Sequence, residues 1–129
     1  MIEAKEIYYT YPSGVEALSG VSTVIHDKEF VSIMGENGAG KTTFVKQLNG
    51  ILKPTKGAVF VNGINTRQAS VAQLSRNVGL VFQNPDHQLF SETVEEEITF
   101  GLRNFGFQER EISERVTWAL CILDLERYR

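Results

Sequence analysis

The 129-residue sequence predicts an α/β fold in which a mixed sheet with an antiparallel part carries a phosphate-binding loop. Residues 2–11 and 17–26 are rich in β-forming side chains and end at turn residues, which predicts two strands before the loop. An apolar run at 30–34 leads directly into a glycine-rich stretch at 35–42, which is the order of strand and loop that a phosphate site requires. The Asn62-Gly63 pair is a strong hairpin signal and indicates that part of the sheet is antiparallel.

The glycine-rich stretch is Gly35-Glu36-Asn37-Gly38-Ala39-Gly40-Lys41-Thr42, which matches the pattern GxxxxGK[ST] in full. Its glycines let consecutive backbone N–H groups curl around an anion, and the helix that begins near Lys41 adds the positive end of its dipole. Lys41 is placed to meet the β and γ phosphates, while the Thr42 hydroxyl can enter the coordination shell of a bridging Mg²⁺. The pattern therefore predicts a site for phosphates and Mg²⁺, with a plain glycine-rich turn as the alternative.

Periodicity and turn residues predict the elements that follow the loop. A helix with one apolar face is expected to continue to about Leu52, before the stop signal at Pro54. Residues 57–61 alternate as a strand, and a capping box at Ser70 and Gln73 starts a short helix that ends at Leu74. The apolar run 78–82 is typical of a buried strand.

Three residues outside the loop are considered for the site. Tyr11 follows the first predicted strand and could stack on an adenine, although a strand aromatic is more often part of the core. Gln83 follows the strand predicted at 78–82, at the edge of the sheet where ligands of α/β folds bind, so it could reach a metal or a water. His87 has no second metal ligand near it and is expected to be solvated.

Two helices are predicted after the glutamine, one capped by Thr93 and Glu96 and ending near Gly106, the other over about 108–124. The net charge is −3 with scattered basic residues, which argues against nucleic acid as a partner. A single cysteine suits a reducing compartment, and no apolar run approaches the roughly 20 residues that span a bilayer. We therefore expect a cytoplasmic location.

The order and spacing of Tyr11, the phosphate loop and Gln83 resemble the ATPases of ATP-binding cassette (ABC) transporters, which are P-loop NTPases. The stretch 81–90, followed by Thr93-Val94-Glu95-Glu96, is similar to the ATPase subunits of energy-coupling-factor importers for metal ions and vitamins. The resemblance covers essentially the whole chain. It implies an ATP-binding core over residues 1–90 and the start of an α-helical subdomain over residues 91–129.

The resemblance also implies roles for residues and partners. Tyr11 would stack on adenine, and Gln83 would contact Mg²⁺ and the attacking water, with Lys41 stabilising charge during hydrolysis. ATP phosphates and Mg²⁺ would be held by the loop residues Gly35, Asn37, Gly38, Ala39, Gly40, Lys41, Thr42 and Thr43. The partners would be transmembrane importer subunits and a second ATPase subunit paired head to tail, which places the protein on the cytoplasmic face of the cell membrane.

Two elements that this family needs for hydrolysis are not found in the sequence. The Leu-Ser-Gly-Gly-Gln signature is absent, since residues 18–22 only echo it and precede the loop. Residues 120–124 imitate the apolar run before the Walker B aspartate, but Leu125 stands where the catalytic glutamate belongs, and the stretch continues a helix. The sequence therefore resembles the N-terminal half of a longer cassette that binds ATP without hydrolysing it. The alternatives are a stand-alone nucleotide-binding module and a small P-loop kinase or GTPase.

Overall fold

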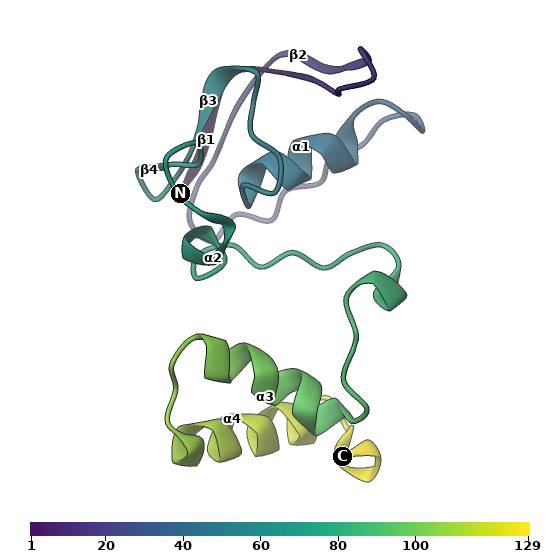
Figure 1. Ribbon diagram of the computed structural model, residues 1–129, viewed down its shortest axis with the longest axis vertical. Helices are drawn as coiled ribbons and strands as arrows, with labels where there is room; N and C mark the ends of the chain where they lie inside the picture. Colours follow the sequence, from purple (N-terminus) through teal and green to yellow (C-terminus); the bar gives the residue numbers. More distant parts are fainter. The chain divides into compact units, whose positions relative to one another are not determined.

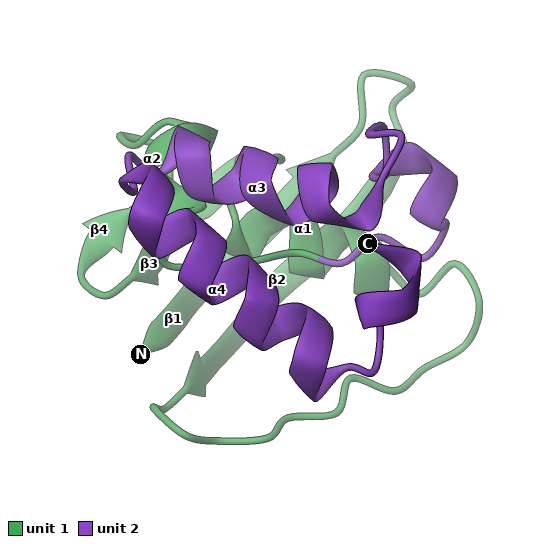
Figure 2. Cartoon of the chain, turned by 90° about the horizontal axis from the view of Figure 1, so that it is seen from below, with its two compact units in different colours: residues 1–80 green, residues 81–129 purple.

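The computed structural model describes residues 1–129 and divides into two compact units, Met1–Leu80 and Val81–Arg129 (Figure 2). The first unit holds the sheet and the glycine-rich loop, and the second holds the two long helices. Residue 90, the predicted boundary between an ATP-binding core and a helical part, falls within the second unit. That functional division stays a prediction.

The first unit is built on a four-stranded sheet of β1 (Ile2–Thr10), β2 (Glu16–Ile25), β3 (Lys56–Val61) and β4 (Ile64–Asn65) (Figure 1). The strand order is β2-β1-β3-β4, and every neighbouring pair is antiparallel. The two strands expected before the loop are confirmed, as is the hairpin at Asn62-Gly63, which joins β3 to β4. The antiparallel part of the predicted sheet is therefore present, but the prediction of a mixed sheet is wrong for this chain, because no parallel pair forms.

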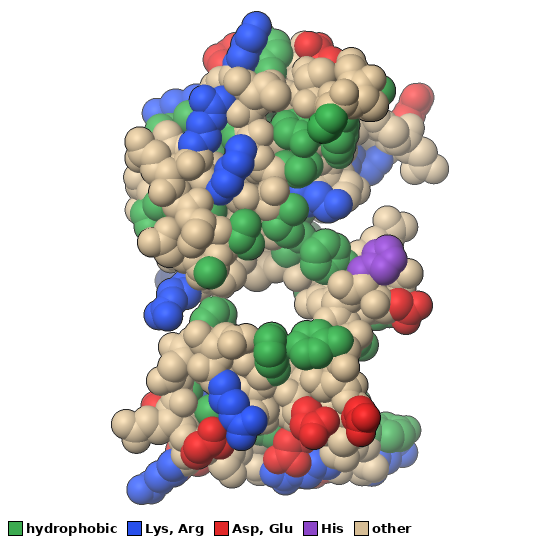
Figure 3. All heavy atoms as spheres, in the orientation of Figure 1, with side chains coloured by type: hydrophobic (Ala, Val, Ile, Leu, Met, Phe, Trp, Pro, Cys, Tyr) green, Lys and Arg blue, Asp and Glu red, His purple; other side chains and the backbone are tan.

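Residues 30–34 and 78–82 were predicted to be strands, but neither segment forms a strand here. Phe30 is 97% exposed, Met34 89% and Val81 86%, so these apolar runs are not buried. A strand needs a neighbour for its backbone N–H and C=O groups, and no strand of this chain pairs with either segment. Hydrophobic side chains are consequently visible on the surface (Figure 3).

Helix α1 (Lys41–Leu48) packs on the sheet and forms the main core of the first unit. Phe44 and Leu48 lie against Ala4, Ile7, Leu18 and Val59, which are all buried. The helix was expected to reach Leu52, but it ends four residues earlier because Asn49 caps it and Gly50 adopts a left-handed φ of 74°.

Helix α2 (Val71–Leu74) closes a smaller core of Val61, Ala69 and Leu74. The predicted capping box is confirmed, since the Ser70 hydroxyl accepts a bond from the Gln73 backbone N–H while the Gln73 side chain accepts one from the Ser70 N–H. The ammonium group of Lys53 donates to the carbonyl oxygens of Thr66 and Ala69. These bonds connect the segment that follows α1 to the segment that precedes α2.

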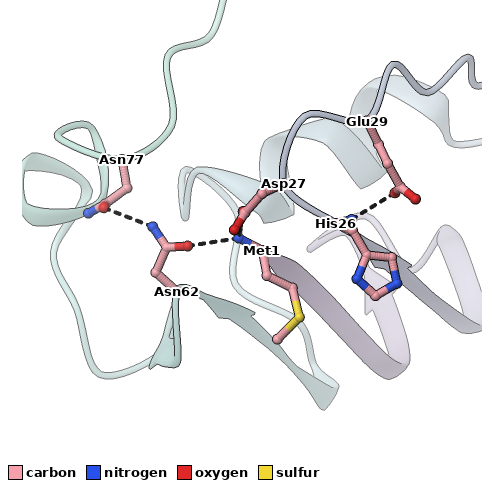
Figure 4. Close-up of polar contacts among 6 residues, drawn as sticks. All are labelled: Met1, His26, Asp27, Glu29, Asn62 and Asn77. Atoms are coloured by element: carbon pink, nitrogen blue, oxygen red, sulfur yellow. Dashed lines mark hydrogen bonds and ion pairs between the residues drawn. The ribbon is translucent and has the colours of Figure 1, made fainter.

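A polar cluster joins four segments of the first unit near the start of β1 (Figure 4). The α-ammonium group of Met1 donates to the Asp27 carboxylate and, over 2.9 Å, to Oδ1 of Asn62. The Asn62 amide in turn donates to Oδ1 of Asn77 over 3.1 Å. The bond from the ammonium group holds the pKa of the Asp27 carboxyl below its usual value. Through the bond between Asn62 and Asn77, the cluster connects the segment after α2 to the hairpin of the sheet.

The second unit is a pair of helices, α3 (Val94–Asn104) and α4 (Glu109–Ile122), preceded by a 3-10 turn, η1 (Pro85–His87), and followed by another, η2 (Glu126–Tyr128). Ile112, Val116 and Leu120 of α4 are buried against Val94, Ile98 and Leu102 of α3. Thr93 caps α3 by accepting a bond from the Glu96 N–H. Residues 120–122 belong to α4, which confirms that the apolar run before Asp124 is not a strand. None of the helices has the length and hydropathy that a membrane span requires.

Gln47 is a polar residue inside the main core, and its replacement is expected to stabilise the protein. Its side chain is 0% exposed, and neither its amide nitrogen nor its amide oxygen has a hydrogen-bond partner. Gln47→Met keeps the shape but removes the unpaired groups, so we expect the free energy of unfolding to rise by about 1 to 3 kcal/mol. Urea denaturation measures the change, with exposed Gln68→Met as the control. A loss of stability in Gln47→Met would contradict an unpaired amide.

Candidate functional site

The glycine-rich loop leads into α1 with its backbone donors available to a ligand. Gly40 is the N-cap residue of α1, and no side chain caps the helix. The first helical bond runs from the Phe44 N–H to the Gly40 carbonyl over 2.8 Å, which leaves the N–H groups of the first turn without a helical partner. Unpaired N–H groups at the positive end of a helix dipole attract anions.

Close packing fixes the position of this loop against the sheet. Gly40 has a left-handed φ of 86°, and a Cβ atom there would overlap the Ala17 carbonyl oxygen and lie 3.2 Å from Cδ2 of Leu18. Both neighbours belong to β2, and Leu18 is part of the main core. Only glycine satisfies both the backbone conformation and the close approach. The loop therefore begins α1 at a position that the core determines.

Lys41 lies folded over the loop rather than extended into solvent. Its ammonium nitrogen donates to the carbonyl oxygens of Gly35 and Glu36, each over 2.7 Å. An ammonium group has three donors, so one remains for a ligand. The two carbonyls hold the positive charge above the segment whose N–H groups are available.

Thr42 and Thr43 point in different directions. Thr42 is exposed at the start of α1, where its hydroxyl is accessible to a ligand. Thr43 is only 6% exposed, and its hydroxyl forms a 2.8 Å hydrogen bond with the phenol of Tyr11. The chain contains no group of three or more His, Cys, Asp or Glu side chains that could hold a metal ion.

Tyr11 lies beside the loop, although 32 residues separate it from Thr43. Its ring is half-buried and meets the ring of Tyr9 edge to face, with 4.9 Å between centroids and 90° between planes. The sequence identified Tyr11 through its position after β1, but nothing in the sequence pointed to its contacts with Thr43 and Tyr9. The structure thus brings Tyr11 together with Lys41, Thr42 and Thr43 in one unit.

A hollow of about 270 Å³ adjoins the loop, and it does not suit phosphate. Its lining includes Lys41, but most of the lining is apolar, with Leu18, Val21, Ile33, Met34 and Phe44 contributing. Apolar walls leave the oxygens of an anion without hydrogen-bond donors. The loop and the start of α1 therefore remain the predicted phosphate site.

Gln83 lies in the second unit, exposed and in an irregular segment. The strand expected before it does not form, so the reasoning from the carboxyl end of a strand lacks its support in this structure. The segment is nevertheless organised, because Oε1 of Gln88 accepts a bond from the Phe82 N–H over 3.1 Å and Asn84 caps η1. The assignment of Gln83 to a metal and a water stays a prediction. His87 lies in η1, exposed, as expected.

A carboxylate of α3 holds the end of the segment that contains Gln83. The Glu97 side chain accepts backbone bonds from Ser91 over 2.9 Å and from Phe90 over 3.2 Å. These bonds, led by the one from Ser91, hold the pKa of the Glu97 carboxyl below its usual value. Residues 90 and 91 are thus fixed to α3 while the carboxylate is ionised.

Comparison with known proteins gives consistent matches. The family model described as "ABC transporter" matches residues 18–128. A putative ABC transporter ATP-binding protein of Pyrococcus furiosus is 50% identical over 128 residues, which are 99% of this chain and 49% of the relative. The energy-coupling factor transporter ATP-binding protein EcfA of Methanocaldococcus jannaschii is 42% identical over 130 residues, 99% of this chain and 47% of the relative. The chain spans about half the length of these two curated relatives.

Two solved structures are similar to this one. The first is cbiO1 from Clostridium perfringens, part of the ABC transporter complex cbiONQ, with a TM-score of 0.83 and 36% identity over 98% of this chain and 51% of that one. The second is a dimeric ATP-binding cassette in a post-hydrolysis state bound to ADP and Pi, with a TM-score of 0.83 and 30% identity over 99% of this chain and 60% of that one. The predicted fold class, a P-loop NTPase of the ABC type, is confirmed.

Proposed function

Because the chain belongs to the ABC transporter family of ATP-binding proteins, we propose that residues 1–129 are the ATP-binding part of an ATPase subunit that couples hydrolysis to import of a metal ion or a vitamin. The observation that carries the proposal is the uncapped start of α1 with the Lys41 ammonium group above it. Similarity to EcfA and to cbiO1 supports the importer class.

Different residues are assigned to the phosphates, the metal and the adenine of Mg-ATP. The N–H groups of Gly38 and of Gly40 to Thr43 bond to phosphate oxygens, and the third proton of Lys41 reaches the terminal phosphates. Thr42 and, in the intact subunit, Gln83 are assigned to the metal. Bound Mg²⁺ neutralises phosphate charge and helps align the terminal phosphate for attack by water. Tyr11 stacks on the adenine.

Turnover requires more than this chain contains. The sequence has neither the signature nor a Walker B carboxylate, so we propose that the 129 residues bind ATP without hydrolysing it. In the intact subunit the missing elements would come from the remaining half and from a second ATPase subunit, and the dimeric cassette bound to ADP and Pi supports such pairing. The partners proposed are transmembrane importer subunits, not nucleic acid. The subunit would lie on the cytoplasmic face of the cell membrane.

Tyr11→Ala tests whether the site binds a nucleotide rather than any polyphosphate. Loss of the ring is expected to weaken ATP binding by roughly 1 to 3 kcal/mol, by analogy with stacked bases, and to weaken binding of inorganic triphosphate less. Tyr11→Trp should preserve ATP affinity because it keeps an aromatic face. Isothermal titration of both ligands gives the comparison. Equal losses of affinity for ATP and for inorganic triphosphate would indicate that Tyr11 has a purely structural role.

A further inference from the structure

We propose that Thr43 and Tyr9 are positioning residues that hold the Tyr11 ring ready for a base and couple base binding to phosphate binding. The proposal rests on the proposed function, since it assumes that Tyr11 meets the base of a nucleotide. It assigns a second role to Thr43 and a first one to Tyr9, which lies on β1 and is not part of the loop.

The backbone of Tyr11 is already fixed before any ligand binds. Tyr11 follows the last residue of β1, and its N–H donates to the Val15 carbonyl over 2.9 Å. Its carbonyl accepts a bond from the Gly14 N–H over 2.8 Å. These two bonds close the turn between β1 and β2 on both sides of the residue. The freedom that remains to Tyr11 is rotation of its side chain.

Two contacts restrict that rotation. The phenol bonds to Oγ1 of Thr43, a buried β-branched residue in the first turn of α1 whose own side chain has few rotamers. The Tyr9 ring lies against Tyr11 at a right angle, an arrangement that aromatic pairs favour. The Tyr11 side chain is therefore already ordered before a base binds. Binding then does not lose the side-chain entropy that ordering would cost, so the affinity is higher.

The Tyr11–Thr43 bond also links the base to the phosphates. A threonine hydroxyl has one proton and two acceptor positions. When the Tyr11 phenol donates to Oγ1, the Thr43 proton is left for a phosphate oxygen, so the two contacts of Thr43 are compatible. Hydrogen bonds in a chain strengthen one another, so a phosphate on Thr43 reinforces the orientation of Tyr11. The ring is best held when both ends of ATP are present.

Tyr11→Phe is the variant that separates positioning from stacking, because it keeps the ring and removes the hydroxyl. Isothermal titration of the full chain should show ATP affinity about two- to tenfold lower, the range for one neutral hydrogen bond. Affinity for inorganic triphosphate should fall less than affinity for ATP, because triphosphate has no base for the Tyr11 ring to contact. Tyr9→Leu, which removes the ring contact, should produce the same selective loss.

Two further variants complete the test. Thr43→Val should lower the affinity for ATP and for triphosphate together. In the double variant Thr43→Val/Tyr11→Phe, the affinity for ATP should show no further selective loss. Tyr8→Phe is the matched control, since Tyr8 is the neighbouring half-buried tyrosine of β1 and its phenol lies near Gly20, on β2 rather than in the loop. It should bind both ligands like the parent.

Each outcome distinguishes this inference from the function on which it rests. If Tyr11→Phe binds ATP as tightly as the parent while Tyr11→Ala loses affinity, stacking stands and positioning is overturned. If Tyr11→Ala also binds ATP like the parent, the base does not meet Tyr11, so stacking and positioning both fail while ATP binding by the loop stands. If Tyr9→Leu does not fold, Tyr11→Phe alone decides, because it removes one oxygen atom and no packing.

Discussion

Replacing Lys41 with alanine is expected to abolish measurable ATP binding. The ammonium group lies over the loop, bonded to the carbonyls of Gly35 and Glu36, with one donor left for the terminal phosphates. Bonds between charged groups contribute more than neutral ones, so loss of this cation should lower ATP affinity by at least about a hundredfold. Isothermal titration measures the loss, and binding of inorganic triphosphate should weaken in parallel, since we propose that Lys41 contacts phosphate rather than the base.

Lys46→Ala is the matched control for this prediction. It removes a lysine from the last turn of the same helix, remote from the loop. It should bind ATP like the parent, and both variants should keep the far-UV circular dichroism of the folded chain. Unchanged ATP affinity in Lys41→Ala would show that Lys41 does not contribute to phosphate binding. Loss of helical signal in that variant alone would instead give the side chain a structural role.

Local signals in the sequence predicted most of the first unit. The β-forming runs gave β1 and β2, the Asn62-Gly63 pair gave the β3–β4 hairpin, and the capping box at Ser70 gave α2. Each of these depends on residues close together in the chain. The loop was found for the same reason, since its chemistry lies in eight consecutive residues.

Features that depend on distant parts of the chain could not be predicted in the same way. The apolar character of residues 30–34 predicts burial, but burial of a strand also requires neighbours, and here Phe30 and Met34 remain exposed. The contact between Tyr11 and Thr43 joins a strand end to a helix start, and no spacing rule connects them. The family resemblance made Tyr11 a candidate for the site, whereas only the structure shows its contacts with Thr43 and Tyr9.

Phosphate release by the 129-residue chain is expected to stay at background at ATP concentrations that saturate the site. The residues proposed to bind ATP, which are the loop with Lys41 and Thr42 together with Tyr11, all belong to the first unit. Hydrolysis additionally needs a carboxylate that orients water, and Asp124 is a poor substitute because it follows the end of α4 with a φ of 54°. Steady turnover that Lys41→Ala eliminates would contradict this account, since Asp124, Glu126 or another surface carboxylate would then have to act.

The melting temperature of the 129-residue chain with and without Mg-ATP tests most directly whether the site is complete within these residues. At about a hundred times its Kd, a ligand that binds only the folded state stabilises it by about 2.7 kcal/mol. For a chain of this size we predict a rise of several degrees, without phosphate release. An unchanged melting temperature in a chain that far-UV circular dichroism shows to be folded would contradict the central claim.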